Sequence, residues 1–438
     1  MSDAAASRLA TQVRAALAHD TRIHAWQLRG ERQAGLQTYL VKTDLESDRR
    51  VEDEILEVTV FVQHDGLLGH STVTLGPGDQ SRLAQRIGDA VYMAGLGGDA
   101  PWTLPAAATW PQVEAFDPAL AGDRVRATSR ALVEAWRGAV AAHPEARPSS
   151  MELFCGESAV TLENSAGLVA RSSSTRVSLL TLLLADGARP AERYSWVERR
   201  RVADLDVGAI VARAATEAHD LTRAIAPPSG RYPVVIDADE ITNLLAPIEG
   251  NAAAAGLYQK SSRFEVGKPL PYANAGGEPL NLVSNALAPF GLTSYAFDGN
   301  GVAGQRVQIV KDNVFVHPWA TKQYADYLEL PPTGGFANWE IPAGTTPLSD
   351  LTTGDGPVLY VSAFSWLTPD QARGNFGSEI RVGYLFDKGM RTPIKGGTVS
   401  GNVFTALGTA RYSRETVFRG DYLGPAAIRF EGLTVAGS

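Results

Sequence analysis

The side chains able to perform metal or nucleophilic chemistry are few and scattered along this chain. His64 and His70 are six residues apart across a Gly-containing turn, so we expect two exposed histidines at strand ends rather than a pair of metal ligands. His317 lies in a β segment, where packing is favoured over catalysis. Cys155 is the only cysteine, which excludes a disulfide within the chain. Without a histidine arranged beside it, a buried and inert thiol is favoured over a nucleophile.

Two groups of charged residues occur before the middle of the chain. Glu217, His219 and Asp220 fall near the end of an expected helix, where a solvated helix end is the favoured explanation. The basic run Arg199–Arg201 is short and isolated, and a solvated strand or helix end explains it better than a binding patch. The formal net charge of −8 argues against a nucleic-acid surface, because phosphate binding requires clustered Lys and Arg.

The N-terminal half predicts an α+β domain over residues 1–226. Apolar residues recur at helical spacing near the start and over 80–94, 123–143 and 207–225. Strand-like runs cover 23–28, 36–41, 56–62, 71–75, 151–154, 159–162 and 177–184. Asp65-Gly66 predicts a hairpin between two of these strands, and Asn164–Gly167 predicts a turn.

Pro227-Pro228 marks the strongest boundary in the sequence, because two prolines cannot continue the preceding helix. We expect a second domain over 231–438, mostly antiparallel β with one prominent helix at about 238–258. Its clearest strands cover 233–236, 358–362, 380–386 and 427–435. A chain of 438 residues exceeds what one hydrophobic core usually serves, so a two-domain α+β protein is predicted.

Short Gly-rich motifs follow one another in a consistent order along the chain. They are His64–Gly69, Asn164–Gly167, Ser262–Phe264, Phe297–Gly301, Gly374–Ser378, Gly383–Gly389, Pro393–Gly396, Gly401-Asn402 and Leu433–Gly437. In this order they resemble the motifs of the TldD/TldE (PmbA) metallopeptidase family. The sequence differs from the family's G-D-F-S turn at two positions: Asn375 replaces the acidic residue, and Gly377 is inserted.

The resemblance implies that catalytic chemistry is missing. The TldD-type subunit carries H-E-x-x-x-H on the helix that opens the C-terminal domain, and a cysteine near the C-terminus. Zinc needs about three protein ligands and a water. In this sequence the two histidines of that motif would fall at about Leu245 and Gly250, and its glutamate at Ala246. No histidine occurs between His219 and His317. The chain therefore resembles a TldE-type subunit, with no catalytic or metal-binding residues of its own and zinc expected in its partner.

The resemblance further implies a heterodimer with a TldD-like H-E-x-x-x-H subunit that processes unfolded or modified peptides in the cytoplasm. The motif residues that become candidates for peptide or partner binding are Ser262, Phe264, Asp298, Asn375, Phe376 and Ser378. No signal peptide and no run of 18 apolar residues is apparent, so no membrane association is expected.

Two alternatives stay open. The chain could be a stand-alone, homodimeric protein that binds a peptide or small molecule without hydrolysing it. A hydrolase with unrelated catalytic groups is a third hypothesis. A neighbouring gene that encodes H-E-x-x-x-H and a C-terminal cysteine would favour the heterodimer.

We predict that the purified chain binds no stoichiometric zinc and cleaves no peptide alone, because residues 220–316 contain no histidine. The measurement is metal analysis after dialysis, beside an assay with casein or an unfolded peptide. One zinc per chain together with chelator-sensitive cleavage would contradict this prediction.

Overall fold

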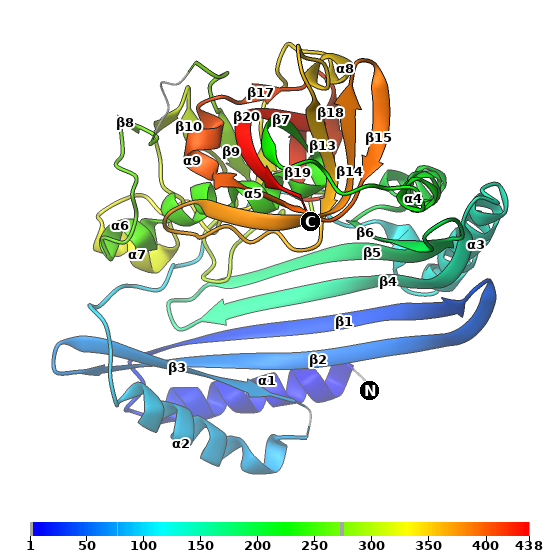
Figure 1. The fold of residues 1–438 in the computed structure, drawn as a ribbon. Coiled ribbons are helices and arrows are strands. Elements are labelled where there is room, and N and C mark those ends of the chain that lie inside the picture. Colours follow the sequence, from blue (N-terminus) through cyan, green and yellow to red (C-terminus); the bar gives the residue numbers. More distant parts are fainter. Residues whose placement is uncertain (1–2, 77, 272–275, 438) are drawn as a thin grey trace.

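The computed structural model describes residues 3–76, 78–271 and 276–437, and Figure 1 shows its arrangement. The first half of the chain forms a six-stranded antiparallel sheet with the strand order β3-β2-β1-β4-β5-β6. Its strands are β1 (Ala25–Val41), β2 (Asp44–His64), β3 (Leu67–Leu75), β4 (Arg147–Asn164), β5 (Val169–Ala185) and β6 (Ala191–Arg199). Most of these strands are long, which extends the sheet well beyond the C-terminal half of the molecule.

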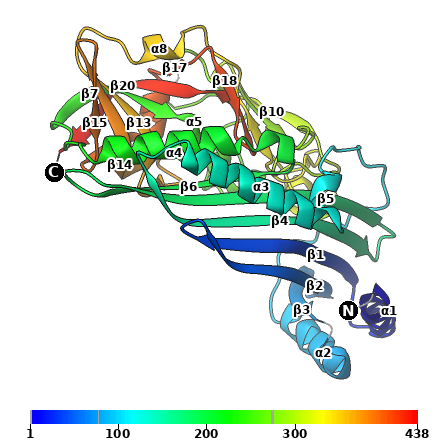
Figure 2. The same cartoon turned by 90° about the vertical axis from the view of Figure 1, so that its right-hand side faces the viewer.

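Four helices cover one face of this sheet. They are α1 (Asp3–His19), α2 (Leu83–Ala94), α3 (Arg124–Ala141) and α4 (Val207–Leu221). Near one end, α1 and α2 bury Val13 and Ile87 against Val58 and other strand residues. Near the other end, α3 and α4 pack on alternate residues of β4 and β5, with Trp136 fully buried. Figure 2 shows α3 and α4 lying across these strands.

The predicted turns are confirmed, whereas the strands are longer than the sequence pattern indicated. Asp65 and Gly66, both at positive φ, connect β2 to β3 as a two-residue hairpin turn. The runs 23–28 and 36–41 belong to the single strand β1, since the polar residues between them pair with β2 on one side and β4 on the other. An interior strand can carry polar residues where one face of the sheet stays open.

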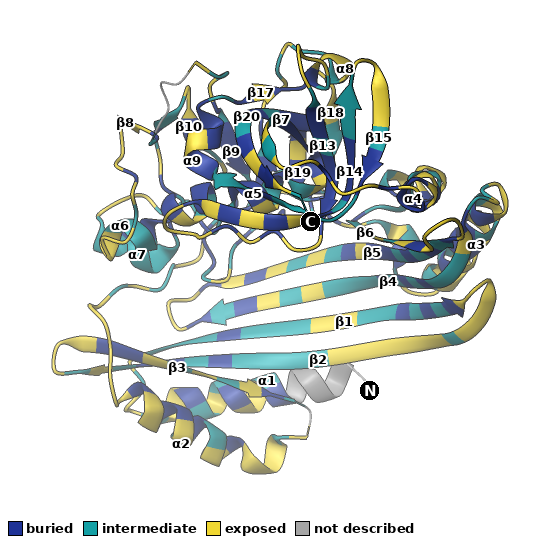
Figure 3. Ribbon diagram, in the orientation of Figure 1, coloured by how far each residue is buried: buried dark blue, intermediate teal, exposed yellow. Residues whose placement is uncertain are grey.

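The second half of the chain forms two further sheets that share a large apolar core with helix α5 (Ala238–Asn251). One sheet has the order β18-β19-β12-β9-β10-β11-β8. Its strands are β8 (Lys268–Pro269), β9 (Leu282–Asn285), β10 (Arg306–Lys311), β11 (Val314–Phe315), β12 (Asn338–Glu340), β18 (Thr416–Phe418) and β19 (Tyr422–Pro425). Figure 3 shows the dense burial of this half beside the exposed far end of β2.

The other sheet of this half runs in the order β13-β7-β20-β16-β14-β15. Its strands are β7 (Gly230–Asp237), β13 (Val358–Phe364), β14 (Asn375–Asp387), β15 (Met390–Ile394), β16 (Thr398–Asn402) and β20 (Ala427–Ala436), with β17 (Arg411–Tyr412) beside β20. Because β14 also pairs with β13, the path of strand pairings closes on itself. Among the described strands of this half, the pairings β7–β13 and β12–β19 are parallel and the others are antiparallel. The predicted α+β class with mostly antiparallel sheets is therefore confirmed.

The helix expected over 238–258 is wrong as one continuous element. It divides into α5 and the short helix α6 (Ala254–Tyr258). The Trp319 N–H donates to the Ala252 carbonyl at 3.1 Å, and the Ala254 N–H donates to the Trp319 carbonyl at 2.9 Å. These bonds to a distant segment replace helical bonds. The remaining helices are α7 (Lys322–Tyr327), α8 (Leu348–Leu351) and α9 (Val403–Leu407). Among the residues that the structure describes, no helix is long and apolar enough to cross a membrane.

The chain passes from the first sheet to the others between Leu221, where α4 ends, and Gly230, where β7 begins. No pairing in the described sheets joins a strand before Pro227 to a strand after it. That residues 1–226 and 231–438 are separate domains stays a prediction, and we use "N-terminal half" and "C-terminal half" for the two parts.

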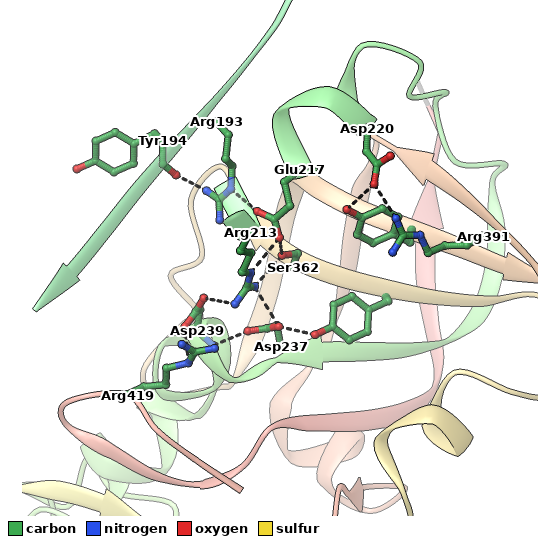
Figure 4. Close-up of polar contacts among 12 residues, drawn as sticks. Arg193, Tyr194, Arg213, Glu217, Asp220, Asp237, Asp239, Ser362, Arg391 and Arg419 are labelled. Atoms are coloured by element: carbon green, nitrogen blue, oxygen red, sulfur yellow. Dashed lines mark hydrogen bonds and ion pairs between the residues drawn. The ribbon is translucent and has the colours of Figure 1, made fainter. Parts of the chain in front are cut away.

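A partly buried network of charged side chains connects α4 with the C-terminal half (Figure 4). Arg213 forms ion pairs with Glu217 at 3.1 Å, with Asp237 at 3.1 Å and with Asp239 at 3.0 Å. Its Nη2 also donates to the Ser362 hydroxyl at 2.8 Å. Since Asp237 caps α5 by accepting from the Asp239 N–H, one arginine links α4 to the start of α5 and to β13.

Glu217 and Asp220 are therefore not part of a solvated helix end, as the sequence suggested. Both carboxylates are buried, at 5% and 3% exposure. Burial alone would raise the pKa of Glu217, but the charges of Arg193 and Arg213 and a hydrogen bond from Ser362 lower it below the ordinary value. Asp220 accepts from Arg391 at 2.7 Å. Partners from later in the chain, which the sequence pattern cannot show, make this burial possible.

We predict that Glu217→Gln destabilises the protein by up to about 3–5 kcal/mol, because it leaves the half-buried Arg193 and Arg213 with one counter-ion fewer. Urea unfolding followed by tryptophan fluorescence measures the change. Glu134→Gln is the matched control, since the Glu134 side chain is 69% exposed in its ion pair with Arg137. Equal stability of the two variants would contradict a cross-linking role for the network.

Candidate functional site

The face of the six-stranded sheet that the helices leave uncovered is polar and partly open. On this open face β1 presents Arg29, Glu31, Gln33, Gly35 and Gln37, which alternate with the residues that face the helices. The register aligns these with residues of β4, such as Gly35 with Gly156, so both strands contribute to the same surface. Such a surface, without its own covering layer, is available for a ligand.

A cavity of about 700 Å³ lies where the open face meets the C-terminal half. Val160 and Leu162 of β4 and Ser172 and Ser174 of β5 form its floor. The segment 110–113 and the residues 294–299 form its walls. Trp110 and Phe297 contact each other edge to face at 5.8 Å, and the Trp110 Nε1–H donates to the Gly301 carbonyl at 3.3 Å. These contacts fix the wall against the sheet.

A second cavity of about 580 Å³ continues along the same face and is lined by the N-terminal half alone. We call the two cavities together the interdomain groove, because the first lies between the N-terminal and C-terminal halves, and the name does not imply separate domains. They share residues of β1, β4 and β5, together with Arg200. Gly35 and Gly156 lie opposite each other in its floor, where a Cβ on Gly156 would approach the Ala34 carbonyl to 2.7 Å. Beyond these glycines, Phe154 and Trp196 pack edge to face at 6.5 Å and form an aromatic end.

The basic residues of the groove differ in how their charge is balanced. Arg29 pairs with Glu31 at 2.6 Å and with Glu57 at 3.1 Å. Arg176 pairs with Glu198 at 3.3 Å. Arg200 is 9% exposed, and its only donated hydrogen bonds go to two backbone carbonyls among the described residues. The groove therefore contains one buried cation without an acidic partner.

The expectation of a solvated basic run is thus wrong for Arg199 and Arg200. Both lie buried at the junction of the two halves, where Arg199 donates to the Asp204 carbonyl at 3.2 Å. Arg201 follows the expected pattern more closely, with an ion pair to Asp204 at 2.6 Å. Nothing local distinguishes these arginines, because the carbonyls that Arg200 contacts lie more than 90 residues away. His317 is exposed rather than packed, which corrects a second expectation.

Four of the six predicted binding residues support the fold of the C-terminal half. Ser262 accepts from the Phe264 N–H at 2.9 Å and donates to the Asn251 carbonyl at 2.7 Å, which fixes the turn after α6. Phe264 and Phe376 are buried in the core. Ser378 is buried at 4% exposure and donates to the Trp366 carbonyl. A binding role for these residues stays a prediction.

Asn375 and Asp298 line different cavities. Asn375 borders an open depression of about 440 Å³, beside Arg263 and Asn402, and accepts from the Asn402 amide at 2.8 Å. Asp298 lines the interdomain groove, but its Oδ1 accepts from the Asn300 and Val302 N–H groups at 2.9 Å each. Burial raises the pKa of Asp298, while these backbone hydrogen bonds oppose the shift. The structure does not gather the six residues into one site.

Helix α5 offers no donor set for a metal. Leu245 is fully buried in the core, and Ala246 has no ligating atom. A side chain at Gly250 would come within 2.8 Å of the Gln371 amide oxygen. Across the described part of the chain, no group of three or more His, Cys, Asp or Glu side chains is arranged to hold a metal ion. A zinc centre therefore does not fit the residues of this helix.

Cys155 agrees with its predicted role as an inert thiol. It lies on the helix-covered face of β4, is 2% exposed and belongs to the core under α3 and α4. Burial raises the pKa of its thiol to about 12.

The fold and the site together define a two-part α+β protein with a polar groove between its parts and no metal donors on the helix that opens the second part. Residues 229–437 match the PmbA/TldA metallopeptidase C-terminal domain. Residues 229–437 therefore form a C-terminal domain of the PmbA/TldA metallopeptidase type.

Similar proteins agree with this assignment. Metalloprotease PmbA of Escherichia coli O157:H7 is 28% identical over 256 residues, which cover 55% of this chain and 54% of the relative. Metalloprotease slr0863 of Synechocystis sp. is 28% identical over 40% of each chain. This chain thus aligns with about half the length of these relatives or less.

Solved structures match over almost the whole chain. TldE from Thermococcus kodakarensis superposes with a TM-score of 0.81 at 17% identity and covers 99% of this chain and 100% of its own. A proposed modulator of DNA gyrase from Bacteroides thetaiotaomicron gives 0.82 at 18% identity and covers 99% of both chains. At these identities the likeness establishes the fold.

We predict that Cys155 does not react with a thiol reagent in the native protein at pH 8, because only a small fraction is thiolate and the thiol is buried. Absorbance after addition of an aromatic disulfide measures the reaction. In guanidinium chloride about one thiol per chain is expected to react. Complete labelling of the native protein within minutes would show that this face of the sheet opens.

Proposed function

We propose that this chain is a non-catalytic, TldE-like subunit that pairs with a TldD-like zinc peptidase subunit and helps to hold unfolded or modified peptides for cleavage. The observation that carries the proposal is a metallopeptidase C-terminal domain whose helix α5 has Leu245, Ala246 and Gly250 where the catalytic subunit has its motif. The proposal includes a cytoplasmic location.

The interdomain groove supports the part of the proposal that concerns the peptide. Ser172, Ser174 and Gln33 offer polar groups that can bond a peptide main chain whatever its side chains. Phe154 and Trp196 offer an apolar surface to a side chain at the other end. A groove of this kind suits an extended peptide more than a compact cofactor.

Zinc belongs, in this proposal, to the partner alone. The partner would supply the metal-bound water and the general base, while this chain would bind and orient peptide and limit access to the site. Residues of this chain would hold no metal, in agreement with the lack of a donor set on α5.

We predict that co-expression with an H-E-x-x-x-H family member from the same genome gives a stable heterodimer, and that peptidase activity appears only in the mixture. A permanent interface of this kind buries on the order of 2,000 Å² or more. Light scattering measures the mass of the complex, and cleavage of an unfolded peptide is assayed with each subunit omitted in turn.

A partner with Glu→Gln in its motif is the control, since it should still form the complex but lose cleavage. If the partner is fully active alone and no complex forms at micromolar concentration, the heterodimer is wrong. A homodimer of this chain that binds peptides without cleavage would then be the better account.

A further inference from the structure

Arg200 carries a buried positive charge that the protein itself does not neutralise. The side chain is 9% exposed and lines both cavities of the interdomain groove. Its Nη2 donates to the carbonyls of Leu292 at 2.7 Å and Ser294 at 3.0 Å. Its Nε has no hydrogen-bond partner, and no ion pair to it occurs within the described residues.

The surrounding charges do not compensate for this cation. Burial, and to a smaller extent repulsion from Arg176, lowers the pKa of Arg200 to about 10. The guanidinium therefore stays protonated at neutral pH. The carboxylates of Glu31 and Glu198 are paired with Arg29 and Arg176. Asp298, the acid in the wall of the same cavity, is engaged by backbone N–H groups. A buried charge without a partner is costly, and a bound anion would remove this cost.

We propose that Arg200 binds a carboxylate group of a ligand in the interdomain groove. Two backbone carbonyls hold one end of the guanidinium, which leaves its other N–H groups without an acceptor. A carboxylate oxygen can accept a charge-assisted hydrogen bond from the Nη1 N–H groups, which donate to no acceptor in the described part of the chain. Ser172 and Ser174, on the same face, can donate further bonds.

A carboxylate fits better than a phosphate. The groove has one unpaired buried cation, and the Asp298 carboxylate in its wall would repel a dianion more strongly than a monoanion. If the ligand is a peptide, which rests on the proposed function, the carboxylate is either its C-terminus or an Asp or Glu side chain. The C-terminus and the acidic side chain both present a carboxylate, and an experiment can distinguish between them.

Three N-acetylated eight-residue Gly/Ser/Ala peptides are the probes: a free acid, its C-terminal amide, and an amide with one internal Glu. Calorimetric titration of the isolated chain, at one ionic strength, measures each dissociation constant. The free acid or the Glu peptide is expected to bind at least tenfold more tightly than the neutral amide, and the preferred acidic probe identifies the source.

Arg200→Gln is expected to remove this preference, so that acidic and neutral probes bind alike. Arg200→Gln also removes the hydrogen bonds to two backbone carbonyls, so a second variant that leaves Arg200 in place is needed. Ser174→Asp places a carboxylate on the same open face and should also abolish the preference, with an unchanged or higher melting temperature. Arg171→Gln removes an exposed cation from the same cavity and is the control, expected to change the affinity less than twofold.

Equal binding of all three probes by the unmodified chain would overturn the inference, as would an acidic preference that survives in Arg200→Gln. Displacement of the acidic probe by inorganic phosphate at far lower concentration than by acetate would overturn the choice of carboxylate. These outcomes do not depend on a partner. If the heterodimer forms and cleaves acid and amide probes equally, the proposed function stands while this inference fails.

Discussion

The ion network centred on Arg213 is the constraint on which the relation between the two halves depends. One guanidinium on α4 contacts carboxylates of its own helix and of the residues that cap and begin α5. Each of these groups would be costly to bury alone, and their mutual contacts make the burial tolerable. These contacts tie the start of α5 to α4, which packs on the first sheet.

The groove itself results from what the first sheet lacks. All four helices of the N-terminal half cover one face, so the other face keeps polar residues along β1, β4 and β5. Gly35 and Gly156 keep its floor free of side chains at the point where the two strands are opposed. The C-terminal half meets this face at the first cavity, where Trp110 contacts Phe297. A sheet covered completely on both faces could not offer such a surface.

In the C-terminal half, the motif residues that can be followed in the structure serve the fold. Leu245 packs in the core and Gly250 lies against Gln371, so these positions of α5 serve packing. The turns that carry the family resemblance have structural roles of the same kind. Ser262 fixes a turn, and Asp298 binds the backbone of the loop that follows it. The agreement of these turns with the family's motifs is therefore stronger evidence for the fold than for a binding site.

The sequence alone determined the α+β class, the turns at Asp65-Gly66 and Asn164–Gly167, the burial of Cys155 and the family of the C-terminal domain, because hydrophobic period, turn chemistry and motif order are local properties. It did not reveal that α5 and α6 are separate helices, since the bonds that part them come from Trp319. It also misjudged Glu217, Asp220 and Arg200 as solvated charges. Whether a charged side chain is buried depends on partners that folding brings from distant segments, and for these residues only the tertiary structure decided it.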